Sequence, residues 1–334
     1  MSSRNRVIAF AVLALACVAG VAVAVAAGIA QSDGSGETPT GHRALADAQS
    51  AGQTVVVFRA LKAGRPEGEG RMAVSAAAQP APRTLESMRC DRSYFAASSG
   101  ICLARGGGFA EGYEARVFDE QFQVRATVPV DGVPSRARVS TDGRYGAVTM
   151  FVTGHSYIEA GGFSTQTVLL DLRSGKAVTD LEQFVVMRGQ RRVTAVDANF
   201  WGVTFAPGDS DTFYATLATA GKTYLIEGSV SGRTARVLHE NVECPSISPD
   251  GTRVAYKRRT GSDSDPWRLT VLDLATMRET PLAETRSVDD QAEWLDDDRL
   301  LYGIEAEVWV VRADGTGEPS RYLAEADSPA VVRQ

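Results

Sequence analysis

The stretch from Cys244 to Leu282 constrains the fold of this chain more than any other feature. It begins with a short apolar segment that ends in the tight-turn sequence Ser248-Pro249-Asp250-Gly251. Then come, in order, an alternating strand at 253–256, a polar loop at 260–265, a strand at 267–274 and a short strand at 278–282. Four strands joined by three turns over so short a stretch are typical of one blade of a β-propeller.

The same unit recurs along the chain with the spacing of about 40–45 residues that propeller blades show. Further copies open near residues 90, 135, 201 and 291. The copy that opens at residue 54 has only three strands, and residues 329–332 resemble the opening of the Cys244 copy. We therefore predict an all-β, six-bladed β-propeller over 53–334, closed by pairing of its N- and C-terminal strands. A β-sandwich is the alternative, but it does not explain the repeated turn-plus-strand unit.

The N-terminal segment predicts export of the propeller. Residues 7–30 carry no charge, and they can span a hydrocarbon core of ~30 Å as one transmembrane helix. Arg4 and Arg6 hold the stub at 1–6 in the cytoplasm. We expect a single-pass anchor with the propeller outside the cytoplasmic membrane; cleavage of a signal peptide near Ala30 and secretion is the alternative.

Residues 31–52 follow, rich in Gly, Ser, Thr and Ala, and they predict a flexible linker with a short helix at 44–49. The formal net charge is −6 at pH 7, and the two arginines of the stub precede the first acidic residue, Asp33. The exported part is thus more acidic than the whole chain. This balance argues against nucleic acid as a partner.

Two of the four cysteines predict a disulfide. Cys90 and Cys102 lie 12 residues apart, across a predicted strand–turn–strand, in a part of the chain expected to be oxidised. A bridge that closes so small a loop contributes about 3 kcal/mol in the entropy model. Two buried free thiols are the alternative. Cys244 is left over, and we expect it to be buried.

Long loops indicate where a propeller of this sequence would bind. The loops at 154–163, 185–200 and 257–265 join strands two and three of a blade, or one blade to the next, and these connections emerge on one face. Long loops on a rigid scaffold are common binding sites. We therefore expect binding on this face, centred on blades three to five, through His155, Tyr157, Arg188, Arg191, Arg192, Asp197, Arg258 and Arg259. For each, a solvated loop residue is the simpler interpretation.

A second set of candidates is expected to line the central channel. Arg136 and Arg138 lie on or near an innermost strand, where we expect them to pair with Asp197, Glu243 or Asp290. The channel-lining candidates are thus Arg136, Arg138, Glu243 and Asp290. Structural ion pairing is the expected role of the two arginines.

The repeats also carry a family resemblance. Ser248-Pro249-Asp250-Gly251 before an apolar strand, followed by Val271-Leu272-Asp273-Leu274, resembles the WD40-like (PD40) repeat of TolB-type propellers. Residues 140–143 with 169–172 form a second copy, and 294–298 with 308–311 a looser third. The resemblance covers about residues 53–334 and implies the propeller fold and a binding role in the cell envelope. That family carries a small α/β domain before the propeller, where this sequence has residues 31–52.

The sequence offers little chemistry for catalysis. It contains no Gly-x-Ser-x-Gly elbow, no Cys/His spacing for zinc and no phosphate-binding loop. We predict no catalytic residues, no metal and no cofactor. The expected function is a monomeric, non-enzymatic scaffold that binds an unknown protein or cell-envelope polymer. The alternative is a hydrolase or lyase acting on envelope polysaccharide or peptide, with carboxylates and His155 at the channel mouth.

Overall fold

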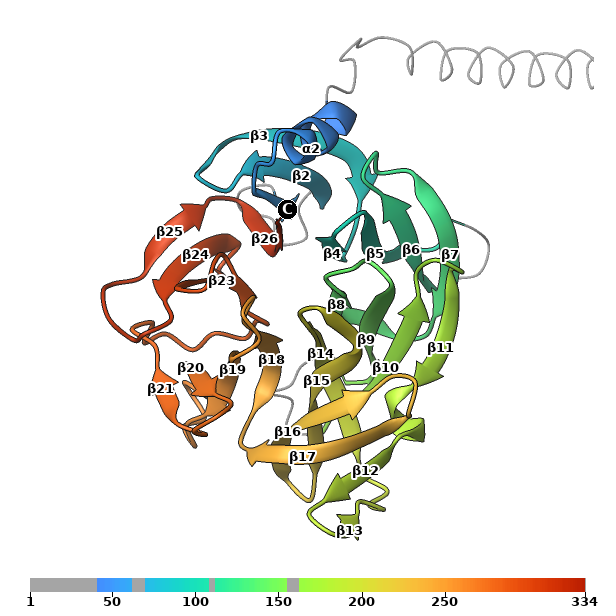
Figure 1. The fold of residues 1–334 in the computed structure, drawn as a ribbon, viewed down its shortest axis with the longest axis vertical. Helices are drawn as coiled ribbons and strands as arrows, with labels where there is room; N and C mark the ends of the chain where they lie inside the picture. The colour runs from blue at the N-terminus through green and yellow to red at the C-terminus, as the bar shows by residue number, and fades with distance from the viewer. Residues whose placement is uncertain (1–40, 62–69, 108–111, 155–161, 334) are drawn as a thin grey trace, which may run out of the picture. The chain divides into compact units, whose positions relative to one another are not determined.

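Strands dominate the structure, as the alternating sequence predicts, and six sheets are arranged as the blades of a six-bladed β-propeller (Figure 1). The computed structural model describes residues 41–61, 70–107, 112–154 and 162–333. The predicted stub (1–6), membrane segment (7–30) and first part of the linker (31–40) lie outside the described residues. Within those that are described, no helix combines the length and apolar character needed to cross a membrane.

Blades one to three contain four strands each, and the strands are named from the innermost outward. Blade one contains β26 (Ala326–Val332), β1 (Val55–Ala60), β2 (Arg71–Ala76) and β3 (Gln79–Arg89). Blade two contains β4 (Arg92–Ala96), β5 (Ser99–Arg105), β6 (Tyr113–Asp119) and β7 (Val124–Val130). Blade three contains β8 (Val133–Val139), β9 (Tyr145–Thr153), β10 (Ser164–Asp171) and β11 (Lys176–Asp180).

Blades four to six complete the ring. Blade four contains β14 (Asn199–Ala206), β15 (Asp209–Thr219), β16 (Lys222–Ser229) and β17 (Thr234–Glu240), and two further strands extend it. Blade five contains β18 (Glu243–Ile247), β19 (Arg253–Arg259), β20 (Trp267–Asp273) and β21 (Glu279–Pro281). Blade six contains β22 (Glu293–Trp294), β23 (Arg299–Ile304), β24 (Glu307–Arg312) and β25 (Ser320–Leu323).

The two ends of the propeller meet in blade one. β26 pairs antiparallel with β1, and the register sets Val332 opposite Val55 and Ala330 opposite Val57. The prediction that residues 329–332 supply the innermost strand of the first blade is confirmed. The paired valines are almost fully buried. Closure of this kind covers the strand edge that an open ring would expose.

A short helix, α2 (Gly41–Ser50), precedes the first strand and contains the helix expected at 44–49. Its Leu45 is fully buried in an apolar cluster shared by blades one and two, with Val74, Phe95 and Phe118 among its members. The helix contacts β2 and β3. Residues 41–50, which fall in the predicted linker, thus belong to the same unit as the propeller.

The repeated turn has a clear physical basis. In blade five the buried Ser248 hydroxyl donates to Asp250 Oδ1 over 2.5 Å and accepts from the Arg253 amide over 2.9 Å. Asp250 also accepts from the Thr252 amide, and Gly251 takes the left-handed φ of +73° that the turn requires. Ser140 and Asp142 make the same bonds in blade three. The Ser-x-Asp-Gly sequence therefore fixes the bend between first and second strands.

The loop expected at 185–200 contains further strand structure. Val185–Arg188 (β12) pairs in parallel with β17, and Arg191–Arg192 (β13) pairs back on β12. Blade four thereby becomes a six-stranded sheet whose added strands lie at the outer edge of the ring (Figure 1). The prediction of a loop is therefore wrong for these six residues, because the apolar side chain of Val186 is buried against the blade.

A disulfide joins Cys90, which follows β3 of blade one, to Cys102 on β5 of blade two. Both residues are nearly fully buried in the cluster that also holds Leu45. Cys244 is a buried free thiol. The bridge therefore ties the closing blade to its neighbour.

The disulfide can be tested by replacing both of its cysteines with Ala. We expect the free energy of unfolding to fall by about 3 kcal/mol, since the unfolded chain regains loop entropy. Urea denaturation measures this change, and mass spectrometry without reduction should find Cys244 as the sole free thiol among 90, 102 and 244. Free thiols at 90 and 102 in the exported protein would show that the bridge does not form.

The turn can be tested through Ser248→Ala. Partial burial raises the pKa of Asp250, but the hydrogen bonds from Ser248 and the Thr252 amide outweigh it and bring this pKa to about 2. We expect the variant to lose about 1–2 kcal/mol of stability at neutral pH. Because the folded-state pKa is depressed, the wild type holds this contribution above the ordinary carboxyl pKa and loses it as pH falls toward 2.

Chemical denaturation at neutral and acid pH measures the difference in the free energy of unfolding between wild type and variant. This difference should become smaller in acid. Replacing the exposed Ser262 by Ala is the control and should change little. If this difference in the free energy of unfolding stays constant down to a pH near 2, ionised Asp250 does not stabilise the turn as proposed.

Candidate functional site

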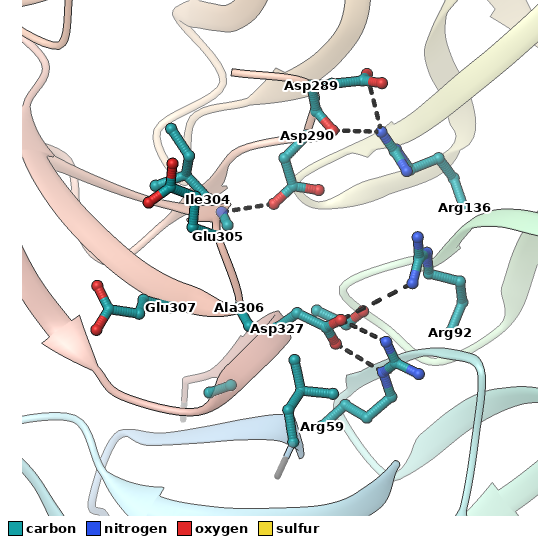
Figure 2. A pocket seen from close by; sticks show the side chains of 14 residues that line it. Arg59, Arg92, Arg136, Asp289, Asp290, Ile304, Glu305, Ala306, Glu307 and Asp327 are labelled. Atoms are coloured by element: carbon teal, nitrogen blue, oxygen red, sulfur yellow. Dashed lines mark hydrogen bonds and ion pairs between the residues drawn. The ribbon is translucent and has the colours of Figure 1, made fainter. Parts of the chain in front are cut away.

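The candidate site lies at one end of the central channel. Strands within a blade are antiparallel, so the start of an innermost strand, the end of the second and the start of the third share one face. Residues from these three places surround a cavity of about 260 Å³ (Figure 2). Its lining comprises Arg59, Leu61, Arg92, Arg136, Asp289, Asp290, Gly303, Ile304, Glu305, Ala306, Glu307, Ala326, Asp327 and Ser328. We call this cavity the channel mouth.

Two acidic residues at the channel mouth are held by cations, Asp327 within blade one and Asp289 from other blades. Arg59 of β1 donates from Nε to Asp327 Oδ1 of β26 over 2.7 Å, and its Nη2 contacts Oδ2. Asp289 lies 2.5 Å from the fully buried ammonium of Lys257 and 3.5 Å from Nη2 of Arg136. Burial raises the pKa of Asp289, but Lys257 and Arg136 outweigh it, so the pKa is lowered and the group is ionised.

Arg92 is less fully compensated than the other arginines of the mouth. Its Nε donates to the Ser135 carbonyl over 3.1 Å and its Nη1 to the Asp91 carbonyl over 3.0 Å. The acidic group paired with it is Asp327, at 3.9 Å, which Arg59 already engages. Burial lowers the pKa of Arg92, and the charges of Arg136 and Arg59 lower it further despite the opposing effect of Asp327.

The channel is closed below the mouth by a buried carboxylate, Glu293 of β22. It accepts from Arg138 Nη1 of β8 over 2.6 Å and from the Tyr94 hydroxyl of β4 over 3.0 Å. It also accepts from the Val331 amide of β26 over 3.2 Å. The Arg138 guanidinium in turn stacks 4.4 Å from the centre of the Tyr94 ring. Four innermost strands thus meet at one side chain, which we call the Glu293 hub.

Gln291 joins the two remaining innermost strands to the same segment. Its amide nitrogen donates to the Val203 carbonyl of β14 over 3.1 Å and to the Pro245 carbonyl of β18 over 2.7 Å. The side chain is 6% exposed. A short stretch of blade six therefore contacts every other blade across the channel.

The predicted channel residues are distributed as follows. Arg136 and Asp290 line the channel mouth, and Arg138 lies deeper, at the Glu293 hub. Arg136 pairs with Asp289 and Arg138 with Glu293, while the charge of the expected partner Asp290 also acts on Arg138. Glu243 is fully buried and pairs with Arg259, and Asp290 accepts from the Gly303 amide. The expected partners differ because cross-channel neighbours depend on how the six blades are set around the ring.

The predicted loop residues do not gather at this mouth. Arg188 pairs with Glu240 and stacks on Tyr224 at the edge of blade four, beside exposed Arg191 and Arg192. Asp197 caps the Thr219–Ala220 turn, and Arg258 pairs with Glu279. His155 and Tyr157 lie outside the described residues. The predicted face is therefore the one that carries the cavity, but the cavity is formed by blades six, one, two and three.

Several residues of the site were not predicted from the sequence, among them Arg59, Arg92, Lys257, Asp289, Glu293 and Asp327. A usable signal existed for Arg59, which interrupts an otherwise apolar strand, where a charge needs a partner. Lys257 is followed directly by Arg258 and Arg259 and gave no such signal. Arg92 and Asp327 stand in polar surroundings and gave no such signal. In the described part of the chain, no group of three or more His, Cys, Asp or Glu residues is arranged to hold a metal ion.

Comparison with known proteins defines the class. No family model and no curated protein sequence matches the chain. It is similar to TolB from Acinetobacter baumannii, with a TM-score of 0.55 and 15% identity, over 84% of this chain and 66% of that one, slightly less than two thirds. It is also similar to a chain in a nidogen/laminin complex, with a TM-score of 0.51 and 9% identity, over 83% of this chain and 98% of that one.

A puromycin-hydrolyzing peptidase from Mycobacterium tuberculosis gives a TM-score of 0.47 at 14% identity, over 77% of this chain and 42% of that one. At these identities the likenesses show the fold alone. The chain is a six-bladed β-propeller. Its fold is TolB-like, as the resemblance of its repeats predicts.

Proposed function

We propose that this propeller is a non-enzymatic binding scaffold that engages a protein or a cell-envelope polymer at the channel mouth. The observation that carries the proposal is the cavity of about 260 Å³, which four blades line with charged groups. The Glu293 hub closes the channel beneath it, so a partner reaches these groups from the mouth. A closed ring also holds the lining residues in fixed positions, which reduces the entropy lost on binding.

The state of the carboxylates supports binding over catalysis. A general acid in a hydrolase needs a raised pKa, and such enzymes place two carboxyl groups about 5–10 Å apart around the scissile bond. At the channel mouth, Asp289 has a lowered pKa and Asp327 is engaged by Arg59. Asp289 and Asp327 therefore hold the side chains of Arg136 and Arg59 in position.

The proposed setting is the outer side of the cytoplasmic membrane, with residues 7–30 as the anchor. The charge-free run and the arginines before it support this setting. The Cys90–Cys102 disulfide supports it independently, because such bonds persist in oxidising compartments.

Site-specific photocrosslinking in the cells that make the protein tests the proposal. A photoreactive residue at exposed Glu305, in the turn after β23, samples the channel mouth. The matched control is exposed Thr276, in the turn between β20 and β21 at the opposite end of the strands. We expect a discrete adduct from position 305 that position 276 does not give. The same adducts from both positions, or adducts from position 276 alone, would contradict the proposal.

A further inference from the structure

The arrangement of two arginines at the channel mouth points to the chemistry of the group that binds there. Arg92 Nε and Arg136 Nη1 donate to the same acceptor, the carbonyl oxygen of Ser135, over 3.1 and 2.9 Å. The two guanidinium groups therefore lie side by side, although their charges repel. Figure 2 shows both reaching into the cavity from neighbouring blades, above Arg59. No described contact engages Nη2 of Arg92, so this nitrogen can donate to a ligand.

The carboxylates nearest to Arg92 and Arg136 are shared with other cations. Asp327 pairs with both Arg59 and Arg92, and Asp289 pairs with both Arg136 and Lys257, which lies behind the wall. Glu307 is paired with Arg321, and Glu305 is exposed, so water screens its charge. A negative group between Arg92 and Arg136 would give both arginines an anionic partner of their own.

We propose that Arg92 and Arg136 form a subsite for one carboxylate of a partner protein, a step that rests on the binding function proposed above. Guanidinium groups bind carboxylates through paired, charge-assisted hydrogen bonds. A monoanion suits this pair, because a phosphate would bring a second negative charge close to Asp290 and Asp327. Leu61, Ile304 and Ala306 add apolar surface at the cavity, which suits the aliphatic stem of an acidic side chain.

Short peptides provide the probe, because the partner is not needed to test the subsite. One pentapeptide, acetylated and amidated, carries a central Asp between glycines, and a second carries Asn in its place. A third, acetylated pentaglycine with a free C-terminus, separates a side-chain carboxylate from a chain-terminal one. Inorganic phosphate and glucuronate serve as competitors. Ligand-observed NMR with the full-length protein measures the affinities.

The wild type should bind the Asp peptide or the free C-terminus and not the Asn peptide. Arg92→Gln should weaken this binding by about tenfold or more, the loss of one charge-assisted contact. Arg92→Lys keeps the charge but loses the two-pronged guanidinium group, so its affinity should lie between those of the wild type and Arg92→Gln. Arg278→Gln, at an exposed turn of the opposite face, is the matched control and should bind as the wild type does. Circular dichroism and thermal melting establish that each variant is folded.

Several outcomes would overturn the subsite. These are binding of Asp and Asn peptides alike, no binding by the wild type, unchanged affinity in folded Arg92→Gln, and a preference for phosphate or glucuronate over the peptide carboxylate. Crosslinking at position 305 separates this failure from that of the function. If the adduct persists in Arg92→Gln, the channel mouth still binds a partner but the proposed carboxylate subsite is wrong. If no adduct specific to the mouth forms, the proposed binding function itself is wrong.

Discussion

Glu293 is the side chain on which the rest of the ring depends. It is 4% exposed, and it accepts hydrogen bonds from three other blades while its own strand belongs to a fourth. A buried carboxylate is stable only where such donors replace the water it has lost. Burial and the adjacent Glu293 charge raise the pKa of Tyr94, which keeps its hydroxyl protonated as a donor. With Gln291 two residues earlier, this segment links all six innermost strands.

This arrangement explains why a cavity lies at the channel mouth. The hub sets buried, hydrogen-bonded side chains across the channel, and the cavity with its incompletely compensated cation, Arg92, lies above it. Closure of the ring also shapes the cavity. Asp327 lies on β26, the strand that pairs with β1, and it binds Arg59 of β1. The strand pairing that closes the ring therefore also builds the wall of the cavity.

The sequence predicts the fold better than the site, for a physical reason. Blades depend on local patterns, such as the Ser248–Asp250 turn and strand alternation, and closure shows as the likeness of residues 329–332 to the opening of another blade. The channel mouth joins groups such as Arg59 and Asp327, 268 positions apart, whose meeting depends on the setting of six blades. The strands within 185–192 were missed for a related cause: the pattern of a four-stranded blade does not predict a parallel strand added outside the fourth.

A double-mutant cycle on Arg138 and Glu293 tests most directly whether the ring is joined through this hub. The single changes Arg138→Met and Glu293→Gln should each destabilise the protein, the former by about 3–5 kcal/mol, because it leaves a buried carboxylate without its cation. The double variant should be more stable than the sum of the two effects implies, with a coupling of about 1–3 kcal/mol measured by chemical denaturation. Additive effects would show that the two groups act independently and that the ring does not depend on the hub.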